Sequence, residues 1–147
     1  MPGTPTSRVQ LALNVSDLDT AVGFYSKLLG TPPNKLRPGY ANFAVADPPL
    51  KLVLVEGHGA PGTLNHLGVE VPSTDEVIAA RTRLRDEGLA TADEDEVACC
   101  YALQDKVWVD APDGEPWEIY TVLADADSFD AGSACCSTAV ESAARCC

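Results

Sequence analysis

The strongest constraint on the fold is an internal repeat. The segment from Gln10 to Val15 begins with a polar residue and then places a larger apolar residue at every second position, and the segment from His66 to Val71 does the same. Alternation with a period of two predicts a strand with one buried face. A chain of 147 residues that repeats its opening strand is therefore expected to contain two similar units around one core.

Each opening strand leads into a helix. Ser16 and Ser73 each precede an acidic residue by three positions, the pattern of a capping box, and Gly30 and Gly88 are placed to end the two helices. Helical spacing predicts one inward apolar face on each helix. The expected inward residues are Leu18, Val22, Tyr25, Leu28 and Leu29 in the first helix and Val77, Ile78 and Leu84 in the second.

Further strand-like segments follow each helix, separated by turns rich in Pro, Asp and Gly. They are expected at 40–46 and 50–56 in the first half and at 101–109 and 117–123 in the second. The plan is βαβββ twice, an α+β fold. We expect one domain over residues 8–124, made of modules 8–56 and 64–124, with a Gly/Pro-rich linker between them. Residues 125–147 are predicted to be a flexible tail containing cysteines.

The second repeat is longer than the first. The interval from His66 to Glu118 exceeds that from Gln10 to Lys51 by 11 positions. The acidic run at 93–96 falls within this excess and is expected to be a solvated loop. Cys99-Cys100 would then lie on, or at the end of, an inserted loop, where function is often carried.

The six cysteines form three adjacent pairs, Cys99-Cys100, Cys135-Cys136 and Cys146-Cys147. Neighbouring Cα atoms lie about 3.8 Å apart, whereas a relaxed disulfide needs about 4.4–6.8 Å. Such pairs are poor crosslinks but good chelators of a soft, thiophilic centre. Cys99-Cys100 could instead be two inert buried thiols, with Lys106 as their nearest cation in sequence. The tail pairs could capture or deliver such a thiophilic ion, or only add thiols.

The net charge of −12 argues against nucleic acid and anionic membranes as partners. No apolar run approaches the roughly 20 residues of a membrane span, and residues 1–8 do not resemble a signal peptide. We expect a cytoplasmic protein, monomeric or homodimeric, in which the thiols stay reduced.

Taken together, these features resemble the vicinal oxygen chelate superfamily, whose paired βαβββ modules curl into a half-barrel around a metal. The resemblance places metal-ligand positions at the start of the first strand and on the last strand of each module. These positions hold Gln10, Lys51, His66 and Glu118. A protonated lysine cannot bind a cation, so the resemblance implies three ligands, Gln10, His66 and Glu118, and open positions as in an Fe(II) site.

The resemblance is narrower than the superfamily and covers about residues 8–127. The matching segments are Arg8 to Leu13, Phe24 to Leu28, Arg37 to Phe43, Pro49 to Leu54, His66 to Val71, Ala98 to Ala102, Gln104 to Val109 and Gly114 to Glu118. They are similar to the ArsI/CadI group. This implies an Fe(II)-dependent dioxygenase that uses dioxygen to cleave the carbon–arsenic bond of trivalent organoarsenicals, giving arsenite, with Cys99 and Cys100 holding the arsenic. No side chain stands out as a general base.

Alternatives remain at each level. The protein could be a cadmium or arsenite sequestrant of CadI type without turnover, or another enzyme of the superfamily, such as an extradiol dioxygenase or a thiol transferase. His66 could be an ordinary buried histidine, Glu118 a solvent-facing residue of an edge strand, and Gln10 a strand-end residue that only forms hydrogen bonds.

Overall fold

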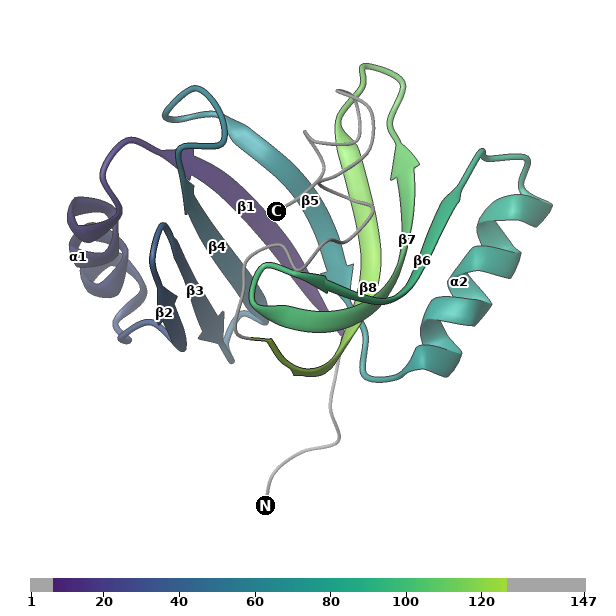
Figure 1. The fold of residues 1–147 in the computed structure, drawn as a ribbon, viewed down its shortest axis with the longest axis horizontal. Helices are drawn as coiled ribbons and strands as arrows, with labels where there is room; N and C mark the ends of the chain where they lie inside the picture. Colours follow the sequence, from purple (N-terminus) through teal and green to yellow (C-terminus); the bar gives the residue numbers. More distant parts are fainter. Residues whose placement is uncertain (1–6, 127–147) are drawn as a thin grey trace.

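A computed structural model describes residues 7–126, which form one curled eight-stranded sheet with two helices (Figure 1). The elements follow the order βαβββ twice. In chain order they are β1 (Arg8–Val15), α1 (Leu18–Leu29), β2 (Lys35–Arg37), β3 (Tyr40–Val45), β4 (Leu50–Glu56), β5 (Leu64–Glu70), α2 (Thr74–Asp86), β6 (Ala92–Cys99), β7 (Ala102–Asp110) and β8 (Pro116–Asp125). The expected α+β half-barrel is confirmed.

The strand order β2-β3-β4-β1-β5-β8-β7-β6 shows how the two repeats join. In each repeat the first strand pairs in parallel with the last, β1 with β4 and β5 with β8. The two first strands, β1 and β5, pair with each other in antiparallel fashion at the centre. Figure 1 shows α1 and α2 at opposite ends of the curved sheet, outside its hollow. β1 and β5, which carry Gln10 and His66, therefore run through the middle of the sheet.

The helix ends follow the capping chemistry, with one difference. Ser73 is the N-cap of α2, and its hydroxyl accepts from the Glu76 amide, as predicted. For α1 the predicted cap, Ser16, is wrong: the N-cap is Asp17, whose carboxylate accepts from the Thr20 amide. The backbone of Asp17 is extended, as is usual for an N-cap residue. The cap of α1 is therefore one residue later in the chain than predicted.

The inward faces of the helices are narrower than predicted. Leu18 in α1 packs against Phe43 and Leu54, and Ala80 and Leu84 in α2 pack against Val107. Two residues expected to face inward point outward, Leu28 with 64% exposure and Ile78 with 48%. The helices touch the sheet along one narrow line, so residues at the margin of the apolar stripe remain in water.

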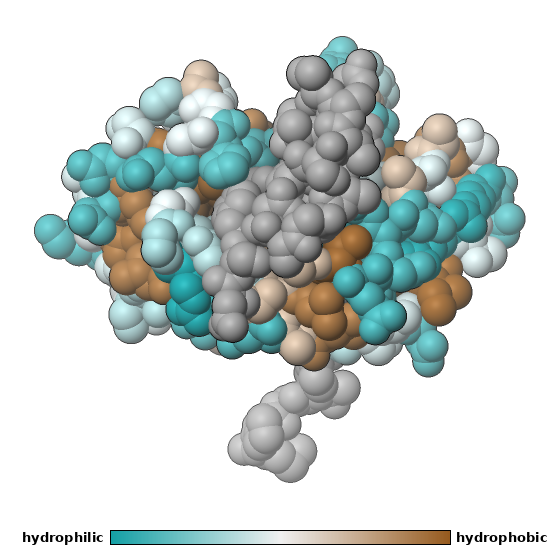
Figure 2. All heavy atoms as spheres, viewed as in Figure 1, coloured by the Kyte–Doolittle hydropathy of each residue, from teal (hydrophilic) through white to brown (hydrophobic). Residues whose placement is uncertain are grey.

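The acidic run is not the solvated loop that its composition suggests. Residues 93–96 lie within β6, which pairs with β7 along its length and contains a bulge between Glu94 and Val97. Arg81 and Arg85 of α2 form ion pairs with Asp93, and Arg81 also pairs with Asp95. Figure 2 shows a band of hydrophilic residues on this side of the molecule. The additional length of the second repeat is therefore a longer β6–β7 hairpin.

The last strand continues beyond its predicted end. β8 runs to Asp125 rather than ending at 123, and Asp125 forms an ion pair with Lys35. The remaining part of the predicted tail, with Cys135-Cys136 and Cys146-Cys147, lies outside the described residues. Neither α1 nor α2 is long and apolar enough to cross a membrane.

Candidate functional site

Three adjacent strands bring the predicted metal ligands together. Gln10 is on β1, His66 on β5 and Glu118 on β8, and all three are nearly fully buried. His66 Nε2 lies 2.6 Å from Glu118 Oε2. The amide nitrogen of Gln10 lies 3.1 Å from His66 Nε2 and 2.9 Å from Glu118 Oε2. The polar ends of the three side chains thus meet at one point.

A glycine makes this meeting possible. Gly68 of β5 pairs with Gln10 on one side and with Glu118 on the other. A Cβ at this position would come within 2.9 Å of Glu118 Cγ and 3.2 Å of Gln10 Nε2. The side chains of Gln10 and Glu118 therefore occupy the space that any larger residue at 68 would need.

The spacing of the donors fits a metal ion. Ligand atoms bonded at about 2.1 Å to one octahedral ion lie about 3.0 Å from one another. His66 Nε2 and Glu118 Oε2 are 2.6 Å apart, somewhat closer than this, and the Gln10 amide nitrogen lies 2.9–3.1 Å from both, where the amide oxygen would stand once the amide is turned over. Within residues 7–126 no group of three or more His, Cys, Asp or Glu side chains could hold a metal, so the set depends on the amide of Gln10.

The Glu118 carboxylate is held as an anion by a lysine. Lys106 Nζ lies 2.9 Å from Glu118 Oε1, and the side chains of both are almost completely buried. Burial alone would raise the pKa of Glu118, but Lys106 and His66 outweigh burial and hold the pKa well below its ordinary value. Because Lys106 occupies Oε1, Oε2 is the oxygen turned toward His66. Lys106, suggested by the sequence as a cation for the thiols, serves the carboxylate instead.

The Gln10 amide is oriented by a tyrosine. The hydroxyl of Tyr120 donates to Gln10 Oε1, which leaves the amide nitrogen facing His66 and Glu118. Burial raises the pKa of Tyr120, so this hydroxyl keeps its proton. A cation needs the amide oxygen, so Gln10 would have to turn its amide over. The Tyr120 oxygen could then accept from the amide nitrogen.

Lys51, at the fourth ligand position of the repeat, belongs to a separate ion cluster. Its ammonium lies 3.1 Å from Glu70 Oε2, and Arg8 Nε lies 2.6 Å from Glu70 Oε1. Burial lowers the pKa of Lys51, with Glu70 opposing this shift. Glu70 gives Lys51 a partner other than Gln10, His66 and Glu118, which supports the exclusion of Lys51 from the ligand set.

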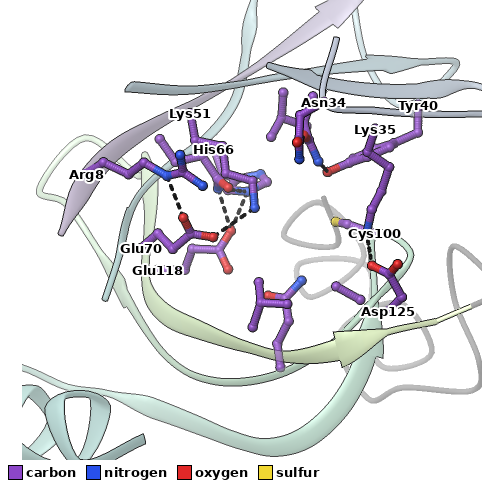
Figure 3. A pocket seen from close by; sticks show the side chains of 16 residues that line it. Arg8, Asn34, Lys35, Tyr40, Lys51, His66, Glu70, Cys100, Glu118 and Asp125 are labelled. Carbon is purple, nitrogen blue, oxygen red and sulfur yellow. Dashed lines mark hydrogen bonds and ion pairs between the residues drawn. The ribbon is translucent and has the colours of Figure 1, made fainter. Parts of the chain in front are cut away.

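The three ligand candidates share a cavity of about 200 Å³ with one of the two predicted arsenic-binding cysteines. Cys100 lines this cavity, and Figure 3 shows it across the opening from His66 and Glu118. Cys99 is fully buried, and its sulfur lies 3.7 Å from that of Cys100. Two sulfurs bound at about 2.3 Å to one tetrahedral centre are about 3.8 Å apart, so this pair matches the spacing for a shared soft atom.

A tight turn, rather than a loop, presents the cysteines. Cys99 ends β6, and Cys100 and Tyr101 join it to β7 with positive φ angles of 54° and 61°. The side chain of Gln104 donates to the Cys99 carbonyl, and Lys35 donates to the Tyr101 carbonyl. These contacts hold a backbone shape that is unfavourable for residues other than glycine.

Some residues around the site were missed from the sequence. Lys106 was considered only in relation to the thiols, and Gly68 and Tyr120 were not considered. A signal existed for two of them, because alternation along β8 puts Tyr120 on the same face as Glu118. Register adds Lys106, which pairs directly with Tyr120 across β7 and β8. Gly68 carried no comparable signal, since its importance depends on its two cross-strand neighbours.

Comparison with known proteins adds three observations. A family model for the glyoxalase/bleomycin resistance protein/dioxygenase superfamily matches residues 8–119. A trivalent organoarsenical cleaving enzyme of Thermomonospora curvata is 61% identical over 134 residues, 89% of each chain. The cadmium-induced protein CadI of Mycobacterium tuberculosis is 57% identical over 141 residues, 96% of this chain and 93% of that protein.

The solved structures agree in fold. The 2,3-dioxygenase LapB of a Pseudomonas species superposes with a TM-score of 0.62 and 17% identity. The match covers 86% of this chain and 44% of that enzyme. At this identity the likeness concerns the fold alone.

Proposed function

Because the chain belongs to the glyoxalase/bleomycin resistance protein/dioxygenase superfamily, we propose that it is an Fe(II)-dependent dioxygenase that cleaves the carbon–arsenic bond of trivalent organoarsenicals and gives arsenite. The observation that carries the proposal is one cavity lined by Gln10, His66, Glu118 and Cys100. The 61% identity with an organoarsenical cleaving enzyme supports the same reaction.

Gln10, His66 and Glu118 would hold Fe(II) through one amide oxygen, one imidazole nitrogen and one carboxylate oxygen. Bound in this way with open coordination positions, Fe(II) would supply activation of dioxygen next to the substrate. Lys106 keeps the Glu118 carboxylate ionised and turns one of its oxygens toward His66. A neutral amide is a weak ligand, so we expect iron to be lost easily during purification.

Cys99 and Cys100 would bind the arsenic atom and leave its organic group free. Thiolate sulfur and trivalent arsenic are both soft, and two sulfurs 3.7 Å apart can grip one such atom. The anchored turn would fix the arsenic at one wall of the cavity, so the reacting bond is held near the ligand set. Cys100 takes part in a disulfide in the structure, so this grip requires reduction of that bond first.

The test is a turnover assay with reduced protein. After removal of the reductant under anaerobic conditions, the protein is loaded with Fe(II), mixed with methylarsenite, exposed to air and assayed for arsenite. Wild-type protein should release arsenite only when iron and dioxygen are both present. Absence of arsenite under these conditions, with iron shown to be bound, would rule out the lyase.

Two variants separate the roles within the site. Cys99→Ser combined with Cys100→Ser should abolish turnover while iron binds as in the wild type. His66→Ala should lose iron and turnover while arsenic still binds to the thiols. Normal turnover in the double cysteine variant would remove the thiol clamp from the proposal but not the metal site.

The second candidate function is sequestration of cadmium or arsenite without turnover. It is favoured by the 57% identity with a cadmium-induced protein and by the sulfur spacing, which suits any soft ion. A sequestrant needs the thiols but not His66. Tight cadmium binding that survives His66→Ala, together with no arsenite release by the wild type, would support it.

A further inference from the structure

Asn65 occupies an unusual position beside His66. In the pairing of β1 with β5, Ala12 faces His66 and Leu13 faces Leu64, so Asn65 is the additional residue of a bulge. Neighbouring residues on a regular strand point to opposite faces, but a bulge redirects a side chain. Here Asn65 Oδ1 lies 2.8 Å from His66 Nδ1. The bulge thus brings the Asn65 amide to the ring nitrogen opposite the ligand cluster.

The direction of this hydrogen bond follows from a chain of contacts that ends on the backbone. The hydroxyl of Thr63 lies 2.6 Å from the Ala60 carbonyl, which can only accept, so Thr63 donates to it. The Thr63 oxygen then accepts from Asn14 Nδ2 at 3.0 Å. Because the Asn14 side-chain nitrogen already donates to Thr63, the Asn14 Oδ1 atom faces Asn65 and accepts from Asn65 Nδ2, also at 3.0 Å. Each step fixes the orientation of the next group.

The same reasoning gives the direction of the hydrogen bond between Asn65 and His66. Because Asn65 Nδ2 donates to Asn14, its Oδ1 is the atom that faces His66, and an amide oxygen can only accept. His66 Nδ1 must therefore carry the proton. The other ring nitrogen, Nε2, lies 2.6 Å from Glu118 Oε2 and 3.1 Å from Gln10 Nε2, so Nε2 is the nitrogen turned toward the ligand cluster.

The linker between the modules holds one end of this series of hydrogen bonds. Asn14 donates its backbone N–H to Thr63 and accepts one from Gly62 through its carbonyl. A Cβ on Gly59 would lie 2.5 Å from Asn14 Nδ2, so the amide of Asn14 packs directly on a glycine of the linker. The linker therefore holds the far end of the chain of hydrogen bonds.

We propose that this chain of hydrogen bonds, running Ala60–Thr63–Asn14–Asn65–His66 and named here the amide relay, keeps a proton on His66 Nδ1 and fixes the ring, so that Nε2 is the nitrogen a metal ion in the ligand cluster would take. Asn65 is then a positioning residue for the metal ligand. The inference rests on the proposed metal role of His66. Histidine ligands commonly donate their second ring N–H to such an acceptor, which fixes the ring and makes the ligand nitrogen more basic.

The first test reads the tautomer without any metal. Nitrogen-15 NMR of metal-free protein labelled at histidine reports which ring nitrogen carries the proton, and the chain contains two histidines, so His58→Gln assigns the signals. The wild type should show His66 protonated at Nδ1. Asn65→Leu, which removes the acceptor at similar size, should reduce protonation at Nδ1, whereas Asn65→Asp should keep it.

The second test measures Fe(II) affinity by anaerobic titration. Loss of such a partner typically costs about 10–100-fold in metal affinity, so we expect this loss for Asn65→Leu and none for Asn65→Asp. The control is Thr91→Val, because Thr91 bonds to Arg85 rather than to the relay and does not line the cavity; its affinity should equal that of the wild type. If Asn65→Leu does not fold, Gly59→Ala acts on the relay from the linker and should shift both readouts in the same direction.

The outcomes separate the relay from the function on which it rests. Unchanged protonation of His66 in both Asn65→Leu and Gly59→Ala overturns the relay. Unchanged Fe(II) affinity in Asn65→Leu, with His66→Ala losing iron, also overturns it while leaving the metal site intact. If His66→Ala binds Fe(II) like the wild type, the metal site itself fails.

Discussion

The two βαβββ halves share one plan but differ in the charge at equivalent positions. On its first and last strands the N-terminal half carries Gln10 and Lys51, whereas the C-terminal half carries His66 and Glu118. Lys51 is neutralised by Glu70, while Glu118 is neutralised by Lys106 and faces His66. One half therefore supplies a cation to the cavity and the other an anion, so a divalent metal is expected to be held chiefly by the C-terminal half.

The halves also differ in the length of one hairpin. β2 has three residues, whereas its counterpart β6 has eight. The longer β6–β7 hairpin reaches across to the first half, where the Tyr101 hydroxyl donates to the Pro38 carbonyl and the rings of Tyr40 and Tyr101 lie 5.6 Å apart. Figure 1 shows this hairpin curving toward β3. Additional strand length in one repeat thus carries the cysteine turn over the shared cavity.

Loss of Lys106 in the C-terminal half should have the largest effect on the free energy of unfolding. Lys106→Met leaves the buried Glu118 carboxylate without its ammonium, and breaking such a pair costs about 3–5 kcal/mol of unfolding free energy. Lys51→Met should cost less, since Glu70 keeps Arg8 as a partner. Urea unfolding of the metal-free proteins measures both, and equal losses would contradict the difference between the halves.

Two single substitutions, one at His66 and one at Gln10, test which half contributes more to metal binding. His66→Gln should weaken Fe(II) binding by more than about 100-fold, or about 2.8 kcal/mol, because an amide replaces the imidazole. Gln10→His creates two imidazoles and a carboxylate and should strengthen binding by about tenfold or more. Anaerobic titration reads both changes. A weaker site in Gln10→His would show that Gln10 does not face the metal.

The ion cluster that joins Arg8 and Lys51 of the N-terminal half to Glu70 of the C-terminal half should affect stability and its pH dependence. Burial would raise the pKa of Glu70, but Lys51 and Arg8 outweigh burial and lower it. A lowered pKa gives stability above the unfolded-state pKa, and that stability is lost as pH falls through the folded-state pKa. Glu70→Gln should therefore cost about 1–2 kcal/mol at pH 7 and progressively less below about pH 4.3. A constant cost across this range would exclude the charge as its source.

Loss of the contact between the β6–β7 hairpin and the turn between β2 and β3 should have the smallest effect on the free energy of unfolding. Tyr101→Phe removes the hydroxyl that donates to Pro38 and should reduce the unfolding free energy by about 0.5–1.5 kcal/mol. Tyr25→Phe on α1, at a hydroxyl away from the hairpins, is the matched control and should change stability less. Thermal unfolding compares the two, and an equal effect would mean that the hairpin contact contributes nothing.

The sequence predicted what depends on local pattern. Alternation and capping residues placed both modules, and the resemblance to the superfamily pointed to Gln10, His66 and Glu118, which the fold brings within 3.1 Å of one another. The acidic run at 93–96 was interpreted wrongly because its composition favours a loop, whereas pairing with β7 and the arginines of α2 are tertiary effects. The bulge at Asn65 depends on register against β1, which no local pattern encodes.

The sheet order has a consequence for the protein in a crowded solution. An open sheet exposes unpaired backbone groups on its outermost strands, which are templates for fibre growth. Here one outermost strand, β2, is only three residues long, and the other, β6, carries four consecutive carboxylates and an irregular register. Neither strand offers a long, flat, uncharged edge to a neighbouring molecule. The acidic residues 93–96, which made β6 look like a loop in the sequence, therefore protect that strand from aggregation.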